Sequence, residues 1–204
     1  MGRTYDTLDD GLAEWIRRQH VFFTATAPSK GGHVNCSPKG LGSLRILDPL
    51  TVAYLDLTGS GAETIAHLRD NGRIVLMFCA FEGPPKIVRV HGAGTVIQAG
   101  DERFDGLLQR FMPLDEFMLA SARSIIQIAV ERVADSCGYG VPRMRYESDR
   151  TQLPAWVDNR VRIRGPKALL EYQAEKNLES IDGLPALDPT IPPLQMVCEV
   201  GDSS

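Results

Sequence analysis

The chain has 204 residues, of which 43% are hydrophobic and 24% charged, and its formal net charge is −4. This composition is typical of a globular protein with a sizeable core, and the acidic balance argues against a nucleic-acid partner, which needs a concentrated basic face. No apolar run is long enough to cross a bilayer, and the N-terminus lacks the apolar core of a secretory signal. We therefore expect no membrane partner and a cytoplasmic location.

The cysteines are far apart and form no Cys-x-x-Cys pair; they are Cys36, Cys79, Cys137 and Cys198. This spacing indicates neither a zinc site nor a disulfide framework. We expect the four thiols to be buried small hydrophobes in a reducing compartment, and we expect no metal site.

The first predicted elements are a helix and a hairpin. Apolar residues recur at helical spacing after Asp9, whose side chain can cap a helix that begins there. Residues 21–27 then have the composition of a strand, and residues 33–37 that of a second strand after a Pro-Ser-Lys-Gly-Gly turn. Two strands joined by such a turn predict a β-hairpin.

The most informative stretch runs from a predicted strand over 51–57 through a glycine-rich loop into a helix. The loop is Thr58-Gly59-Ser60-Gly61, and its small residues leave backbone N–H groups open to an anion beside the positive end of the helix dipole. Ser60 and Glu63 have the spacing of a capping box, and Asn71-Gly72 predicts the end of the helix. The loop is a candidate phosphate seat, although a helix cap alone also accounts for its composition.

Further strands complete an all-β pattern. Residues 74–81 form an apolar strand and residues 86–97 a long alternating one, in which Gly92 and Gly94 predict a bulge or a tight bend. The remaining elements are a short strand over 44–47, a helix over 104–111 and a strand over 124–133. About seven short strands interrupted by a few helices favour a barrel with helical additions.

The tail after residue 142 has a different character, with one predicted helix over 166–178. Before it, Arg160, Arg162 and Arg164 alternate with apolar residues. This pattern is compatible with a basic strand edge or with an anion contact, but it favours a solvated face.

Taken together, four blocks of the sequence resemble the flavin-binding split-barrel family related to pyridoxamine 5′-phosphate oxidase. The resemblance covers residues 10–142, and the blocks that carry it are residues 33–40, 54–73, 81–92 and 137–142. It implies a mainly β fold with helices, namely a six-stranded split β-barrel that forms a homodimer with two FMN molecules in grooves between the subunits. It also implies a flavin-binding domain over 1–142 and a C-terminal helical extension over 143–204 that packs on the barrel or the dimer.

The resemblance carries cofactor-binding positions over to this chain. The flavin phosphate and ribityl chain would lie against Ser37, Pro38, Lys39, Gly40, Asp56, Thr58, Gly59, Ser60, Gly61, Glu63 and Thr64, and the partner subunit would add Lys86 and Arg89. Lys39 is the best nearby counter-charge for a phosphate, although a solvent-exposed loop lysine is the plainer interpretation. Asp56 could accept a hydrogen bond from a ribityl hydroxyl or simply hold the loop. The hydroxyls of Thr58, Ser60 and Thr64 could donate hydrogen bonds to the ligand.

Two departures separate the chain from authentic pyridoxamine-phosphate oxidases. Those enzymes place an arginine–lysine pair where this chain has Glu63-Thr64, and they close with an arginine–histidine signature, whereas this chain has no histidine after His91. We therefore do not expect vitamin B6 oxidation. Without the basic pair, a bound phosphate would depend on Lys39, the helix end and Arg89.

The leading hypothesis is an FMN-dependent oxidoreductase that serves a small-molecule substrate and a reductant, neither of which the sequence identifies, and no catalytic residue stands out. A second hypothesis keeps the barrel but replaces FMN by a deazaflavin or by haem. Haem would need an axial ligand, for which His20, His33, His67 and His91 are the only histidine candidates. A third is a flavin-binding dimer that catalyses nothing.

Overall fold

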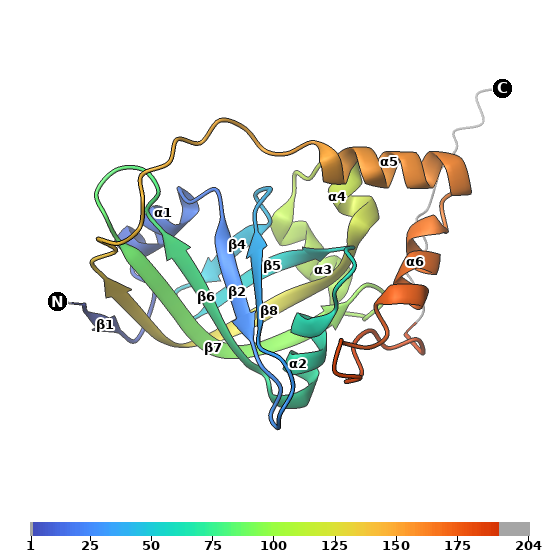
Figure 1. Cartoon of the computed structure of the whole chain (residues 1–204), viewed down its shortest axis with the longest axis horizontal. Coiled ribbons are helices and arrows are strands. Elements are labelled where there is room, and N and C mark those ends of the chain that lie inside the picture. Colours follow the sequence, from blue (N-terminus) through green and yellow to red (C-terminus); the bar gives the residue numbers. More distant parts are fainter. Residues whose placement is uncertain (1, 192–204) are drawn as a thin grey trace.

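The computed structural model describes residues 2–191, which form one eight-stranded antiparallel sheet and six α-helices (Figure 1). The strands are β1 Thr4–Tyr5, β2 Phe22–Thr26, β3 Asn35–Lys39, β4 Leu44–Asp48, β5 Thr51–Leu57, β6 Arg73–Cys79, β7 Ile87–Gln98 and β8 Ala122–Ser136. The helices are α1 Asp10–Arg17, α2 Glu63–Asn71, α3 Phe104–Leu108, α4 Glu116–Ser121, α5 Gln152–Arg164 and α6 Ala168–Lys176, with a 3₁₀ turn η1 at Gln109–Phe111. None of these described helices combines the length and the apolar character that crossing a bilayer requires.

The strand order is β3-β2-β6-β7-β8-β5-β4, and β1 pairs with β8 beside this path. The long strands β7 and β8 lie in the middle, and the sheet curves into a barrel-like shape around them (Figure 1). In the described part of the chain the end strands β3 and β4 do not pair with each other, so the barrel is split. The predicted fold class is confirmed, but the sheet has eight strands rather than six.

The strand that the sequence pattern missed is β1, which has only two residues and therefore no readable alternation. Its position is fixed by a distant partner, because Thr4 and Tyr5 pair with Ala134 and Val133. The Tyr5 hydroxyl also donates to Asp135 at 2.9 Å. Such a strand exists only because β8 presents an edge for it to join.

Local signals placed several elements correctly. The Asp9 side chain accepts a hydrogen bond from the Leu12 amide at 2.7 Å and caps α1 as predicted. Strands β2 and β3 form the predicted antiparallel hairpin. At the end of α2, Gly72 adopts a left-handed conformation with φ of 72°, which glycine does at little cost.

The core lies on both faces of strand β5. Val52 and Tyr54 pack into the interior of the barrel with α1 and α2, whereas Ala53 and Leu55 pack into a second cluster beneath α3, η1 and α4. A strand buried on both faces carries a continuous apolar run instead of an alternating one. This burial accounts for the apolar run from Val52 to Leu55 in the middle of β5.

The cysteine prediction was only partly right. Cys79 is buried, but Cys36 and Cys137 are exposed, and Cys198 lies outside the described residues. Cys36 is on β3, an end strand of the sheet, where alternate side chains face solvent. Cys137 follows directly after the end of β8.

The tail returns across the sheet before it forms its two helices. After β8 an extended segment crosses the rim of the barrel and leads to α5 and α6 (Figure 1). Along it the Met144 amide donates to the Phe81 carbonyl at 2.9 Å, and the Tyr146 ring stacks on His20 with 3.6 Å between ring centroids. Helix α5 was not predicted, because Val157 is its only buried residue in the described structure and its sequence therefore has no apolar stripe.

The bulge predicted at Gly92 is present as a shift of register between β7 and β8, and it makes a sharp test of the fold. A Cβ atom at this position would lie 2.1 Å from the Ala129 carbonyl oxygen, which is backbone and cannot rotate away. Gly92→Ala is expected to lower the free energy of unfolding by about 3 kcal/mol or more, as overpacking does. Gly106→Ala is the matched control, because no atom lies within 4 Å of its added Cβ. The control should be neutral or stabilising by about 0.5–1 kcal/mol; equal losses in denaturant unfolding would contradict this account of Gly92.

Candidate functional site

The loop between β5 and α2 is anchored at its first residue. Both the Thr58 amide and its hydroxyl donate to the Ser121 carbonyl, at 2.7 and 2.8 Å. The hydroxyl also accepts a hydrogen bond from Gln173 of α6 at 2.8 Å. Thr58 is 1% exposed, so it holds the loop to the end of α4 and to the tail.

Beneath the loop lies a buried group of three charged residues. The Asp56 carboxylate receives the Arg123 Nε at 2.7 Å on one oxygen and the Lys39 Nζ at 2.8 Å on the other. The side chains of Asp56 and Arg123 are 0% and 5% exposed, and that of Lys39 is 21% exposed. Because Lys39 is on β3 and Asp56 on β5, this ion pair joins two parts of the sheet that no backbone ladder connects.

The two cations keep the carboxylate charged. Burial alone would raise the pKa of the Asp56 carboxyl, but the charges of Arg123 and then Lys39, together with their hydrogen bonds, lower it well below its usual range. A carboxyl whose pKa is lower in the folded than in the unfolded chain stabilises the fold above pH of about 4, and this stabilisation declines as the pH falls. At neutral pH the three side chains carry one net positive charge.

Arg123 also determines which way the loop faces. Its guanidinium donates to the carbonyls of Gly59 at 3.3 Å and Gly61 at 2.8 Å, and Asn177 of the tail donates to the Gly59 carbonyl at 2.9 Å. The loop carbonyls are thus held inward. Among the described residues no acceptor is present for the amides of residues 60–64. These amides at the start of a nine-residue helix form a potential anion site.

The predicted capping box at this helix is wrong. The N-cap residue is Ala62, which makes no side-chain cap, and the helix begins at Glu63. Ser60 lies two residues before the N-cap, between the two carbonyls, of Gly59 and Gly61, that Arg123 holds. The Glu63 carboxylate instead folds back over Gly61, occupying the space where a Cβ atom of that residue would be.

A cavity of about 450 Å³ lies beside the loop. It is lined by His33, Val34, Asn35, Cys36, Ser60, Gly61, Glu63 and Ile181. Its volume is within the range of small-molecule sites. Its lining therefore combines Ser60, Gly61 and neutral side chains with one carboxylate, that of Glu63.

Strand β3 reaches this cavity through a chain of side-chain hydrogen bonds. The Ser37 hydroxyl donates to the side-chain Oδ1 of Asn35 at 2.9 Å, and the side-chain Nδ2 of Asn35 donates to the buried Thr64 hydroxyl at 2.9 Å. Pro38 lies on the same strand directly before Lys39, and Gly40 follows directly after the strand ends. Asn35 was not singled out from the sequence, since one amide in an apolar hairpin gives no signal of its own.

Lys86 and Arg89 lie elsewhere. The Lys86 ammonium is over the Trp15 ring, 5.3 Å from its centroid, and Arg89 donates to the Ser136 hydroxyl at 3.2 Å. Neither lines the cavity beside the loop. Within one chain, therefore, these two residues lie away from the other predicted cofactor-binding residues.

The four histidines occupy separate surroundings. His67 is fully buried and contacts the Thr26 hydroxyl through Nδ1 at 2.9 Å, so it packs inside the barrel. His33 is exposed and pairs with Asp182 at 2.7 Å. His20 stacks on a tyrosine of the crossing segment, and burial lowers the pKa of His91.

The three arginines of the tail lie on helix α5, which excludes the predicted strand edge. The Arg160 guanidinium packs against the rings of Tyr172 and Trp156, 4.5 and 5.4 Å from their centroids. Arg162 donates to Asn159 at 2.9 Å. These contacts connect α5 with α6 and do not reach the loop after β5.

The pyridoxamine 5′-phosphate oxidase family model matches residues 8–137 of the chain. The chain belongs to this family. A curated relative in the same family, the protein ustO of Aspergillus flavus, is 42% identical over 196 residues, which cover 90% of this chain and 77% of that protein. The family match spans the whole sheet from β2 to β8 and includes the loop after β5.

Solved structures similar to this family member include HupZ of Group A Streptococcus, with 22% identity and a TM-score of 0.46 over 61% of this chain and 90% of that chain. An FMN-binding protein of Syntrophomonas wolfei has 17% identity and a TM-score of 0.46 over 67% of this chain and 90% of that chain.

The buried ion group predicts that Arg123 contributes much more to the stability of the fold than a surface arginine of the same chain. Arg123→Met leaves Asp56 with one cation and the Gly61 carbonyl without its donor, while Asn177 still donates to the Gly59 carbonyl, so the free energy of unfolding should fall by about 3–5 kcal/mol. Arg103→Met is the matched control, since its pair with Asp101 is at the surface with the arginine side chain 56% exposed. The control should cost less than about 1 kcal/mol. Similar losses in urea unfolding at neutral pH would show that Arg123 contributes no more than a surface charge.

Proposed function

We propose that this family member is a flavin-binding protein that uses FMN to oxidise or reduce a small organic substrate. The observation that carries the proposal is the loop after β5: its carbonyls are bonded to Arg123 and Asn177, and its amides have no acceptor within residues 2–191 and lie beside a cavity. Backbone amides at the start of a helix are well suited to a phosphate.

The residues around the loop fit a phosphate with one exception. The amides of residues 60–64 and the Ser60 hydroxyl are neutral donors, and the charged group beneath them has one net positive charge. The Asn35 side chain positions strand β3, since its two N–H groups already donate to Thr64 and Thr26. The exception is Glu63, whose carboxylate lies over Gly61 and would repel an anion. Because Glu63 is on the first turn of α2 and is only partly buried, its side chain can turn away from the loop.

The roles of the protein groups follow from these positions. Bound FMN would supply the electron transfer, while the protein holds and orients it. The loop amides and Ser60 would hold the phosphate, and strand β3 from Ser37 to Gly40 would lie along the rest of the cofactor. Lys39 acts as a counter-charge that is already fixed by Asp56 at 2.8 Å, so its position does not depend on the ligand.

We further propose that the active form is a homodimer, with residues 1–142 as the flavin-binding domain and residues 143–204 as an extension. Lys86 and Arg89 do not line the cavity of their own chain, which supports a contribution from the partner's copies. Gln173 and Asn177 of the extension bond to the loop, which supports a positioning role for the tail.

Two variants of the loop should change FMN affinity in opposite directions. Ser60→Asp adds a carboxylate at the proposed phosphate seat and should weaken FMN at least about tenfold, since like charges about 4 Å apart near a surface repel by about 4 kcal/mol. Glu63→Gln removes the opposing carboxylate and should tighten FMN about three- to tenfold. Riboflavin, which lacks the phosphate, should show little change with either variant. Flavin fluorescence titrations of flavin-free protein measure all four affinities.

Gln152→Glu is the charge-matched control, because it adds the same charge at an exposed position at the start of α5. It should leave both flavins unaffected. If Ser60→Asp and the control have equal effects, the loop is not the phosphate seat. If the wild-type protein is purified colourless and binds neither FMN nor riboflavin, the flavin proposal itself fails. A protein that binds FMN but transfers no electrons from any reductant would be the non-catalytic dimer.

A further inference from the structure

The chain after helix α6 forms a short loop over residues 178–186, which we call the tail loop. The two sides of its base are joined by a hydrogen bond from the Ala186 amide to the Leu178 carbonyl at 2.8 Å. Ala186 is buried in the core of the barrel, and the side chains of Leu178 and Leu184 pack against that core. The base of the tail loop is therefore fixed to the barrel by apolar contacts.

The tip of the tail loop is bonded to the turn between β2 and β3 (Figure 1). The Asp182 carboxylate accepts the His33 amide at 2.8 Å on one oxygen, and the His33 Nδ1 lies 2.7 Å from the other oxygen. The hydrogen bonds from the His33 amide and from its ring lower the pKa of the Asp182 carboxyl, so this carboxylate is charged at neutral pH. The Asp182 side chain is 16% exposed. The tail loop and the turn are thus held together without any ligand.

This contact lies at one end of the cavity beside the loop after β5. His33 and Ile181 both line that cavity, together with Ser60 of the proposed phosphate seat. Strand β3 begins at Asn35, two residues after His33, and runs from there to Lys39. The tail loop therefore bounds the cavity at the Asn35 end of β3.

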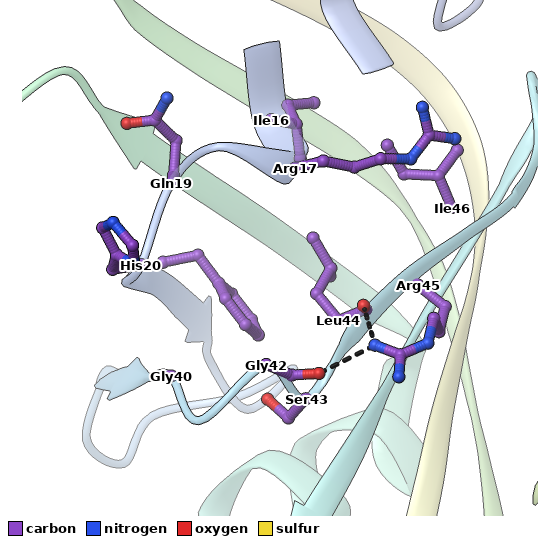
Figure 2. A pocket seen from close by; sticks show the side chains of 11 residues that line it. Ile16, Arg17, Gln19, His20, Gly40, Gly42, Ser43, Leu44, Arg45 and Ile46 are labelled. Atoms are coloured by element: carbon purple, nitrogen blue, oxygen red, sulfur yellow. Dashed lines mark hydrogen bonds between the residues drawn. The ribbon is translucent and has the colours of Figure 1, made fainter. Parts of the chain in front are cut away.

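The opposite end of β3 leads to a second cavity. Gly40 follows the strand directly and lines a space of about 280 Å³ between the end of α1 and β4. Figure 2 shows this space bordered by His20, Gly40 and Leu44. A ligand that lies along β3 therefore has room to extend at the Gly40 end, whereas the tail loop occupies the Asn35 end.

We propose that the tail loop makes the cavity selective for a flavin whose phosphate is terminal, so that FMN binds and FAD is excluded. The inference rests on the proposed function, which places the phosphate at the amides of residues 60–64 and the rest of the cofactor along β3. FAD is FMN with an adenylate attached through that phosphate, so its second phosphate and adenosine continue beyond the phosphate seat. There they meet Ile181 and the paired His33 and Asp182. A steric clash, and repulsion between the Asp182 carboxylate and a second phosphate, both act against FAD alone.

The first test compares the affinities of FMN and FAD. Calorimetric titration of flavin-free wild-type protein should show FMN binding at least about tenfold more tightly than FAD, which corresponds to about 1.4 kcal/mol. Asp182→Ala removes the carboxylate and releases the tip of the tail loop from His33. It should reduce the ratio of the two affinities to about threefold or less by tightening FAD, and it should change FMN by less than about twofold.

Asp188→Ala is the matched control for this variant. Asp188 is another aspartate of the tail, but its carboxylate accepts only from the Thr190 amide and hydroxyl among the described residues, and it does not line the cavity. This control should keep the wild-type ratio of FMN to FAD affinity. Equal binding of FMN and FAD by the wild-type protein, or the same ratio in both aspartate variants, would overturn the proposal.

Two adjacent glycines of the turn open the same contact from the other side. A Cβ atom at Gly32 would lie 2.6 Å from the nearer Asp182 oxygen and 2.8 Å from the Pro28 ring, so Gly32→Ala pushes the tail loop away from the turn. Gly31→Ala is its control, because Gly31 has a similar φ, 59° against 71°, and its added Cβ would meet no atom within 4 Å. Gly32→Ala should tighten FAD at least about threefold and Gly31→Ala should not. Equal effects on FAD would contradict a role of the tail loop.

Hydrogen exchange tests the contact without any flavin. In the flavin-free wild-type protein the His33 amide donates to Asp182, so Asp182→Ala should speed its exchange at least about threefold. The Ser29 amide is the internal reference, because it lies in the same turn but donates to Asp70 of α2. An unchanged His33 amide would show that the tail loop is not held to the turn, which overturns the inference.

The measurements distinguish failure of this inference from failure of the proposed function. A protein whose His33 amide is protected but which binds neither FMN nor riboflavin contradicts the proposed function, and the selectivity falls with it. A protein that binds FMN and FAD equally well keeps the proposed flavin function and refutes only the selectivity assigned to the tail loop.

Discussion

The buried ion group formed by Asp56, Arg123 and Lys39 is the interaction on which the rest of the site depends. Strands β3 and β5 have no backbone ladder between them, so the Lys39 ammonium on one Asp56 oxygen connects the open side of the barrel. The other oxygen binds Arg123, which reaches on to the carbonyls of the loop. One carboxylate therefore links the closure of the sheet to the shape of the candidate site. A buried charge of this kind costs desolvation energy and is stable only while both partners remain.

The tail reinforces the same loop from the opposite side. Gln173 bonds to the Thr58 hydroxyl and Asn177 to the Gly59 carbonyl, from the last turn of α6 and the residue after it. The loop is thus held at its start and at its middle without any ligand. A site whose conformation is fixed before binding does not spend binding energy on ordering itself. The two helices of the tail therefore help to hold the loop of the candidate site in place.

The sequence by itself determined the parts of the structure that depend on neighbouring residues: the cap of α1 at Asp9, the β2–β3 hairpin and the end of α2 at Gly72. It also determined the family to which the chain belongs. Hydrogen bonds within a turn or cap and the period of a strand involve residues only a few positions apart, so they can be read directly. Only the tertiary structure decided that Arg123, 67 residues from Asp56, bonds to it and to the loop, and that Lys39 is held by the same carboxylate. These contacts follow from strand order and register, which no local pattern specifies, and the path they impose on the loop is also why the capping box predicted from its spacing does not form.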